Sequence, residues 1–168
     1  MKKMLSILML GALPAIALAA GDHAGGHGMQ GHDMSDMNKD AHASMAGKAG
    51  DPSRVSRTIE VTMDDSMRYT PDKIDVKAGE TIQFFVRNTG KIQHEMVIGS
   101  MDELREHAEM MRNMPGMQHA ESNMITLKLG QRGDIVWQFD KAGAVDFACL
   151  LPSHMKAGMV GRTVVNNP

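Results

Sequence analysis

The sequence has only one cysteine among its 168 residues, so no disulfide bond can form within the chain. A single cysteine needs another use: an intermolecular bridge, a reactive thiol or a metal ligand. Acidic side chains number 20 and basic ones 18, so the chain lacks the basic excess that nucleic-acid binding requires. No Ser-His-Asp set or nucleotide-binding loop rises above chance, and nothing predicts a substrate pocket. We therefore do not expect an enzyme.

Long hydrophobic runs are missing after the first 20 residues. Residues 1–20 are typical of a secretory signal peptide, with Lys2 and Lys3 at the start, an apolar stretch over 5–18 and a small-residue cleavage signal ending at Ala19. The apolar stretch is too short to span a membrane. We expect export to a bacterial periplasm and a soluble mature protein. Loss of the two lysines would change the net charge from −2 to −4.

The one cysteine shares a short segment with two other residues of metal-ligand type. His154 lies five residues after Cys149, and Met159 five residues after His154. A blue-copper site uses two histidines, one cysteine and a weak axial methionine, and this mixture of soft and harder donors suits both Cu(I) and Cu(II). His94 lies near the start of the strand predicted over 92–98 and is the candidate for the fourth ligand, whereas Glu95 should face the other way as a structural or surface carboxylate. Each residue alone would more often be core; together they predict a mononuclear copper site.

Alternating apolar and polar residues predict about eight short strands from residue 54 onward, separated by Gly, Pro and Asp turns. This pattern favours an all-β antiparallel sandwich or barrel, whose apolar strands should fold without metal. One helix is expected over about 101–113, because Ser100 and Glu103 form a capping box. The predicted organisation is a signal peptide (1–20), a disordered arm (21–53) and a β domain (54–168) with a Met-rich helical insert (101–120).

The arm over 21–53 has almost no aliphatic or aromatic residues. It cannot bury enough apolar surface to offset the entropy lost on ordering, so we predict disorder. His-rich tracts bind metals and thioethers favour Cu(I), so the arm is either a weak copper-collecting segment or a solvated linker. The residues concerned are His23, His27, Met29, His32, Met34, Met37, His42 and Met45.

His107, Met110 and Met111 in the predicted helix, and Met114 at its end, fall at helical spacings of three and four residues, which places several of them on one face. They form either a second copper site, suited to Cu(I), or a stripe that packs on the sheet. A methionine stripe at helical spacing is more often core, although a flexible Met-rich surface can also dock partners.

Several segments of the β domain resemble the cupredoxin family, and in particular the small periplasmic, plastocyanin-like copper-binding proteins linked to bacterial copper tolerance. The matching segments are Tyr69-Thr70-Pro71, Ile74 to Thr81, Phe84 to Asn88, His94-Glu95, Trp137-Gln138-Phe139, Phe147-Ala148-Cys149, Pro152-Ser153-His154 and Ala157-Gly158-Met159. The resemblance implies a Greek-key sandwich in which His94, Cys149 and His154 are the strong copper ligands and Met159 the axial one. Ser153 departs from it, because many relatives have Gly before this histidine. The 101–120 segment is also long for a simple cupredoxin.

Three functions fit this ligand set or its surroundings. We favour a periplasmic, redox-active copper protein that serves copper tolerance, since the His/Met enrichment outside the site would be of no obvious use to a simple electron carrier. The alternative is a soluble electron-transfer shuttle between redox complexes. A metal buffer that binds only through the arm is the third. A centre bridged by two cysteines, and a multicopper oxidase with His-x-His pairs, are both excluded. The expected partners are copper ions and a periplasmic redox or copper-handling protein, with no nucleic acid and no membrane insertion.

Overall fold

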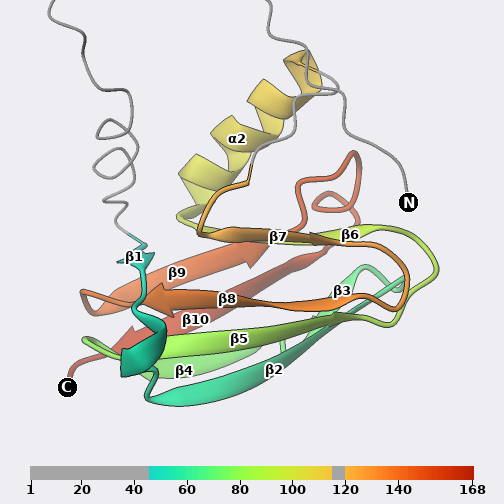
Figure 1. Cartoon of the computed structure of the whole chain (residues 1–168). Coiled ribbons are helices and arrows are strands. Elements are labelled where there is room, and N and C mark those ends of the chain that lie inside the picture. The colour runs from blue at the N-terminus through green and yellow to red at the C-terminus, as the bar shows by residue number, and fades with distance from the viewer. Residues whose placement is uncertain (1–45, 115–119) are drawn as a thin grey trace, which may run out of the picture. The chain divides into compact units, whose positions relative to one another are not determined.

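A computed structural model describes residues 46–114 and 120–168 (Figure 1). The predicted signal peptide, residues 21–45 of the predicted arm, and Met117 and His119 lie outside these ranges. Within them, no helix is long and apolar enough to cross a membrane.

The described chain folds into two five-stranded sheets that pack face to face (Figure 1). One sheet has the strand order β1-β8-β5-β2-β3, and the other has the order β4-β10-β9-β6-β7. The strands are β1 (Lys48–Ala49), β2 (Arg57–Asp64), β3 (Arg68–Thr70), β4 (Lys73–Lys77), β5 (Thr81–Asn88), β6 (His94–Gly99), β7 (Met124–Leu127), β8 (Arg132–Gln138), β9 (Gly143–Ala148) and β10 (Val160–Asn166). The prediction of an all-β sandwich with one inserted helix is confirmed.

Each sheet contains one parallel strand pair, β2 with β5 and β4 with β10, while the other pairs are antiparallel. The sequence pattern could not show this departure from a wholly antiparallel sheet. Side chains alternate between faces with a period of two in either kind of strand, so alternation predicts strands but not their partners.

Paired structure begins before the predicted boundary at Arg54. β1 is antiparallel to β8, and a short 3₁₀ helix spans Pro52–Arg54. Ala46 is buried, and its carbonyl accepts a hydrogen bond of 2.9 Å from the indole N–H of Trp137. Two residues of strand are too few to show alternation, so no sequence pattern marks β1.

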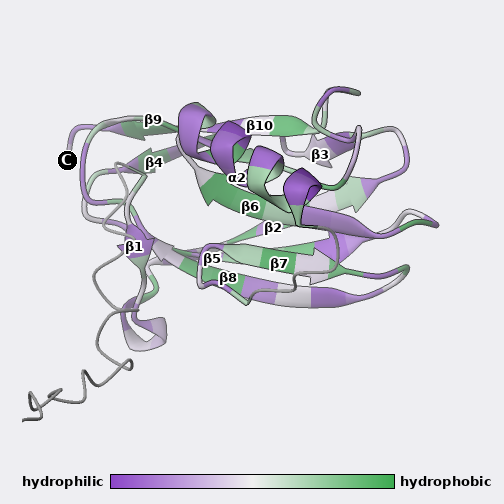
Figure 2. Cartoon of the chain, turned by 90° about the horizontal axis from the view of Figure 1, so that it is seen from above, coloured by the Kyte–Doolittle hydropathy of each residue, from purple (hydrophilic) through white to green (hydrophobic). Residues whose placement is uncertain are grey.

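The core lies between the sheets and is built from the inward faces of the alternating strands (Figure 2). In β4, Ile74 and Val76 are buried while their neighbours along the strand are exposed. The largest buried side chains are Trp137, Phe84, Phe139 and Phe147. Burying an aliphatic or aromatic side chain of this kind contributes about 1.5–3 kcal/mol. Because these residues are not metal ligands, we expect the metal-free protein to fold.

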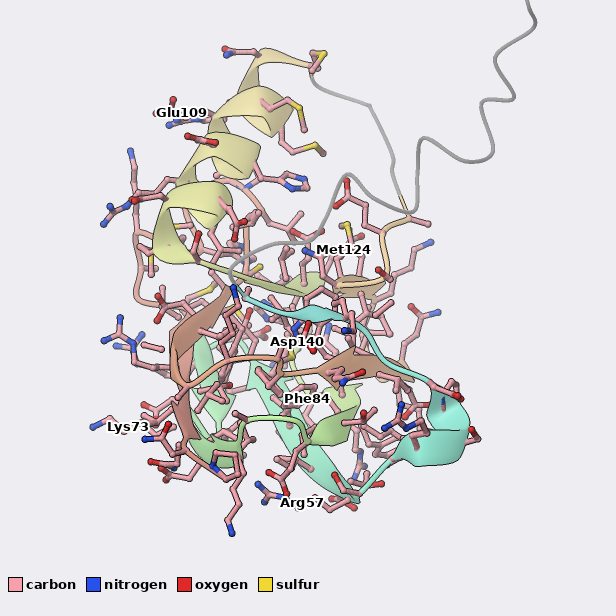
Figure 3. All side chains as sticks on the ribbon, turned by 90° about the vertical axis from the view of Figure 1, so that its left-hand side faces the viewer. Arg57, Lys73, Phe84, Glu109, Met124 and Asp140 are labelled. Carbon is pink, nitrogen blue, oxygen red and sulfur yellow. The ribbon has the colours of Figure 1, made fainter. Side chains whose placement is uncertain are left out.

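Helix α2 (Met101–Asn113) packs against β6 and β9. The predicted capping box is present: the Ser100 hydroxyl accepts from the Glu103 N–H at 3.3 Å, and the Glu103 carboxylate accepts from the Ser100 N–H at 2.7 Å. Leu104 is the one buried residue of the helix, and it packs with Val97, Ala148 and Leu150. Sulfur atoms project from the last turns of α2 (Figure 3).

Candidate metal centre

The two strands that carry His94 and Cys149 are direct neighbours. β6 and β9 are antiparallel, with Val97 opposite Ala148. His94 begins β6, and Cys149 follows the last residue of β9. Strand pairing therefore brings the two side chains to the same end of the sheet, although they are far apart in the sequence.

A tight loop joins β9 to β10 and holds the other two predicted ligands. The His154 carbonyl accepts from the Met159 N–H at 3.1 Å, and the Met159 carbonyl accepts from the Cys149 N–H at 3.2 Å. A third backbone bond, from the Ala157 N–H to the Ser153 carbonyl at 2.9 Å, closes a turn within the loop. These bonds fix both ends of the loop against each other.

Three side chains converge at this end of the sandwich. The ligand atoms of His94, Cys149 and His154 all lie within 4.8 Å of one another, so the group can hold a metal ion. The Cys149 sulfur is 3.3 Å from Nδ1 of His154, and the two imidazole centroids are 5.1 Å apart. His94 and Cys149 are fully buried, whereas His154 is partly exposed. Solvent therefore reaches the group from the His154 side.

Nδ1 of His94 is buried and has no hydrogen-bond partner within the described part of the chain. Its other ring nitrogen, Nε2, lies 3.1 Å from a carboxylate oxygen of Asp65. A buried polar atom without a partner costs about 1–3 kcal/mol. A metal ion bound by the neighbouring thiol and imidazole would satisfy it, so the residues present fit a copper site.

Met159 is also fully buried and belongs to the same core cluster as Cys149. The backbone bonds described above place it at the end of the loop, next to the chain at Cys149. This position agrees with the predicted axial role, which stays a prediction.

Burial controls the protonation of the sulfur and imidazole donors. It raises the pKa of the Cys149 thiol to about 12, and the negative charge of Glu95 adds to this effect. The pKa of His154 is lowered, first by burial and then by the neighbouring His94. At neutral pH the metal-free site therefore holds a protonated thiol and a neutral His154 whose lone pair can bind a metal.

Glu95 is a structural carboxylate, as predicted. It is buried and accepts hydrogen bonds from the Thr126 hydroxyl at 2.9 Å and from the Leu150 N–H at 3.3 Å. These bonds connect β6 to β7 and to the residue after Cys149. Glu95 therefore holds the loop in place and is not part of the group that can hold the metal.

Several residues of β3 and β5 support the site through hydrogen bonds that were not predicted. The Tyr69 hydroxyl donates to the Glu95 carbonyl at 2.6 Å, and the Arg68 guanidinium donates to the Ala157 carbonyl at 3.0 Å. The Asn88 side-chain amide donates to the carbonyls of Ile92 and Leu127 at 2.8 and 2.9 Å. Tyr69 and Asn88 fall in segments that carry the cupredoxin resemblance, but no local pattern shows which groups their side chains contact.

Ser153 adopts the left-handed backbone conformation, with φ of 74°. Glycine favours this region, and other residues pay a cost of about 1–2 kcal/mol there. The serine therefore keeps the turn that a glycine would make. The neighbouring His154 still lies 3.3 Å from Cys149, as expected for a change in loop detail only.

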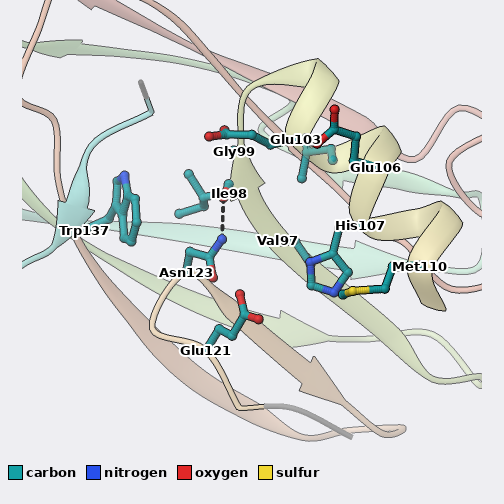
Figure 4. A pocket seen from close by; sticks show the side chains of 11 residues that line it. Val97, Ile98, Gly99, Glu103, Glu106, His107, Met110, Glu121, Asn123 and Trp137 are labelled. Atoms are coloured by element: carbon teal, nitrogen blue, oxygen red, sulfur yellow. Dashed lines mark hydrogen bonds between the residues drawn. The ribbon is translucent and has the colours of Figure 1, made fainter. Parts of the chain in front are cut away.

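The methionines of α2 do not form the core stripe that the sequence analysis favoured. Met110 and Met114 are each 38 % exposed, and Leu104 supplies the buried contact instead. His107 lines two cavities beside the helix. One, of about 430 Å³, also contacts Met110 (Figure 4), and the other, of about 370 Å³, also contacts Met111.

The comparisons with known proteins agree with this geometry. Residues 55–166 match the family described as copper-binding proteins of the plastocyanin/azurin family. The chain therefore belongs to this family, the cupredoxins, and copper is its metal.

Three relatives carry the name copper-resistant cuproprotein CopI, and two of them are compared with this chain below. The protein from Rubrivivax gelatinosus is 47% identical over 139 residues, which cover 80% of this chain and 84% of that protein. The one from Vibrio cholerae is 37% identical over 140 residues, covering 83% and 76% of the two chains. This chain is thus a cupredoxin similar to CopI proteins.

Solved structures of other cupredoxins share the fold. Auracyanin from the photosynthetic bacterium Roseiflexus castenholzii matches with a TM-score of 0.57 and 26% identity, covering 66% of this chain and 98% of that one. Auracyanin B matches with a TM-score of 0.60 over 72% of this chain and 96% of that one. Because auracyanin B is only 19% identical to this chain, this match supports a shared fold and nothing more.

Proposed function

We propose that this cupredoxin is a periplasmic, redox-active protein that binds one copper ion at a type-1 site and serves copper tolerance. His94, Cys149 and His154 would be the strong ligands, and Met159 the axial one. One observation carries the assignment: the unpartnered Nδ1 of His94 lies with a thiol and a second imidazole in a group that spans 4.8 Å. Copper bound there supplies exchange of one electron between Cu(I) and Cu(II).

The chain contributes a rigid, largely dry site. Cys149 and His94 are buried in the sandwich, and backbone bonds close the loop that carries His154 and Met159. Ligands held in this way move little when the metal changes oxidation state, so little reorganisation opposes electron transfer. His154 is the proposed ligand at the solvent side, and partner proteins would approach from there.

Copper tolerance is favoured over a role as electron shuttle by the named relatives and by the exposed methionines of α2. The shuttle remains the second candidate because the solved neighbours include an auracyanin from a photosynthetic bacterium, which is 26% identical to this chain. Deleting the gene discriminates the two roles. Loss of a tolerance protein makes the cells copper-sensitive, whereas loss of a shuttle leaves copper tolerance intact and impairs respiration or photosynthesis.

The visible and EPR spectra of the protein loaded with one equivalent of Cu(II) test the ligand set. We expect an intense thiolate-to-copper band that is lost in Cys149→Ala. Met155→Leu is the matched control, because Met155 lies in the same loop but outside the proposed set, and it should keep the band. A variant without residues 21–45 should keep it too. A pale spectrum that Cys149→Ala leaves unchanged would contradict the proposal and identify the arm as the binding site.

The exposed methionines of α2 favour a second, weaker site for Cu(I). Met110 lies in the last turn of α2 and Met114 is its C-terminal cap, whose N–H donates to the Met110 carbonyl at 3.1 Å, and thioethers prefer Cu(I). In a chain that lacks residues 21–45 and carries Cys149→Ala, we expect Met110→Leu with Met114→Leu to remove weak Cu(I) binding in a chelator competition. Met124→Leu, in β7, is the control and should retain it. Equal binding by both variants would exclude the helix site.

A further inference from the structure

One carboxylate outside the proposed ligand set contacts a ligand side chain directly. An oxygen of Asp65 lies 3.1 Å from Nε2 of His94, which is 29 residues away in the sequence. We propose that Asp65 is a positioning residue of the copper site: it holds the Nε2–H of His94, so that Nδ1 becomes the ligating atom, and it places a negative charge against the ring. This inference rests on the proposed function in so far as His94 is a copper ligand.

The hydrogen bond decides which tautomer of His94 is present. A neutral imidazole has one N–H, and an ionised carboxylate can only accept. The proton must therefore lie on Nε2, where Asp65 accepts it, and the lone pair is left on Nδ1. This is the nitrogen that has no other partner among the described residues. Ligand histidines in other metal proteins are oriented in the same way, by a second hydrogen bond on the far nitrogen.

The turn that carries Asp65 is built around this contact. The two carboxylate oxygens of Asp65 also accept from the Lys91 N–H at 2.9 and 2.8 Å, and one accepts from the Ile92 N–H at 3.3 Å. These residues lead directly to His94. Asp65 therefore connects the turn after β2 to the segment that delivers the histidine, and fixes both the ring and its backbone.

Gly90 leaves the space that the carboxylate needs. A Cβ atom on Gly90 would lie 2.1 Å from the oxygen of Asp65 that contacts His94. Any larger residue at position 90 would push the carboxylate away from the ring. The position thus offers a way to disturb the contact without changing a charge.

The charge on Asp65 also affects the metal. A hydrogen bond to a carboxylate makes the imidazole a stronger donor, which favours Cu(II) over Cu(I). Asp65 is 38 % exposed, so solvent screens part of its charge, but its contact with the ring is direct. Removing the charge should therefore raise the reduction potential of the copper.

Three variants separate the effect of the Asp65 hydrogen bond, the effect of its charge, and the effect of any nearby charge. Asp65→Asn keeps an acceptor oxygen and removes the charge, and Asp65→Ala removes both. Asp64→Asn is the matched control, because it removes an equal charge one residue away, where the carboxylate accepts from the Ser66 N–H at 2.9 Å. We expect the copper reduction potential to rise in Asp65→Asn relative to both wild type and Asp64→Asn. Asp65→Ala should bind Cu(II) about 10–100-fold more weakly.

NMR of the metal-free protein tests the positioning role without copper. The His94 ring nitrogens should report the Nε2–H tautomer in wild type and Asp65→Asn, and a mixture of tautomers in Asp65→Ala. Because Asp65→Ala also loses two backbone contacts and can unfold the loop, Gly90→Ala serves as a second perturbation and should shift the tautomer in the same direction. A single unchanged tautomer in both variants would overturn the proposal.

The outcomes also distinguish this inference from the proposed function. A thiolate-to-copper band in wild type, with Asp65→Asn and Asp64→Asn at equal potential, would refute the role of Asp65 and leave the copper site intact. If the band is absent from wild type, the ligand assignment fails, and the NMR comparison alone then decides whether Asp65 orients the ring.

Discussion

Replacing Gly161 by alanine is expected to destabilise the sandwich by about 1–3 kcal/mol, the usual cost of overpacking a filled core. Gly161 in β10 lies opposite Phe147 in β9, and a Cβ atom there would come within 2.1 Å of the Phe147 ring. The ring has nowhere to move, because it is buried and packs edge-on against Tyr69 with centroids 5.0 Å apart. Strand or ring must therefore shift.

The same displacement should disturb the copper site. Phe147 is two residues before Cys149 on the same strand segment, and the Tyr69 hydroxyl holds the Glu95 carbonyl, next to His94. A shift of the Phe147 ring thus reaches both buried ligands. We expect Gly161→Ala to weaken the thiolate-to-copper band as well as the fold.

Denaturant unfolding of the metal-free protein measures the stability effect. Val164→Ala is the control, since Val164 lies on the same strand but is 41 % exposed, and its effect should stay within about 0.5 kcal/mol. Adding Phe147→Leu to Gly161→Ala should recover part of the loss, because the smaller side chain leaves room for the new methyl group. An unfolding curve for Gly161→Ala that matches wild type would show that position 161 has room for a methyl group. Strictly additive effects of Gly161→Ala and Phe147→Leu would show that the two side chains do not clash.

Local sequence patterns predicted most of the fold. Alternation predicted about eight strands from residue 54 onward, where the described part of the chain has nine of three residues or more, and the Ser100 capping box gave the start of α2 at the residue that the structure shows. The elements are predictable because side-chain periodicity and helix capping act over only a few residues. Strand partners cannot be predicted in this way, so neither the parallel pairs nor β1 could be inferred from the sequence.

The candidate site was predictable for a different reason. One cysteine, and a histidine and a methionine at short spacing after it, restrict the chemistry whatever the fold, and the structure brings Cys149, His154 and the distant His94 together. The residues that support the site are not of the His, Cys and Met types that make up a blue-copper site, so their chemistry does not identify them. Asp65 and Arg68 contact the site only because the segment that joins β2 to β3 lies near it, and no local pattern shows this.

The methionines of α2 show where periodicity misleads. Their spacing matches that of a core-facing stripe, but Leu104 already fills the contact with the sheet, and Met110 and Met114 remain exposed. A sequence pattern states which residues share a face; it does not state which face the neighbouring sheet covers. That choice depends on how the helix packs on β6 and β9, which is a property of the whole fold.

Copper affinity is expected to rise about tenfold for each pH unit between about pH 7 and 9, because copper must displace one proton from the site. Burial raises the pKa of the Cys149 thiol to about 12, so the thiol is protonated throughout this range, whereas the ligand is the thiolate. The lowered pKa of His154 means that this residue has no proton to lose there. Raising the pH therefore removes competition at a single group.

Competition with a Cu(I) chelator of known pH dependence measures the slope, and a pH-stat titration should show one proton released per copper. Met159→Leu is the informative control. A thioether carries no proton, so this variant should bind copper more weakly with the same dependence on pH. An affinity independent of pH would mean either that the thiol is already ionised in the metal-free protein or that Cys149 does not bind the metal. The thiolate band of the loaded protein separates these two cases, because only the first retains it.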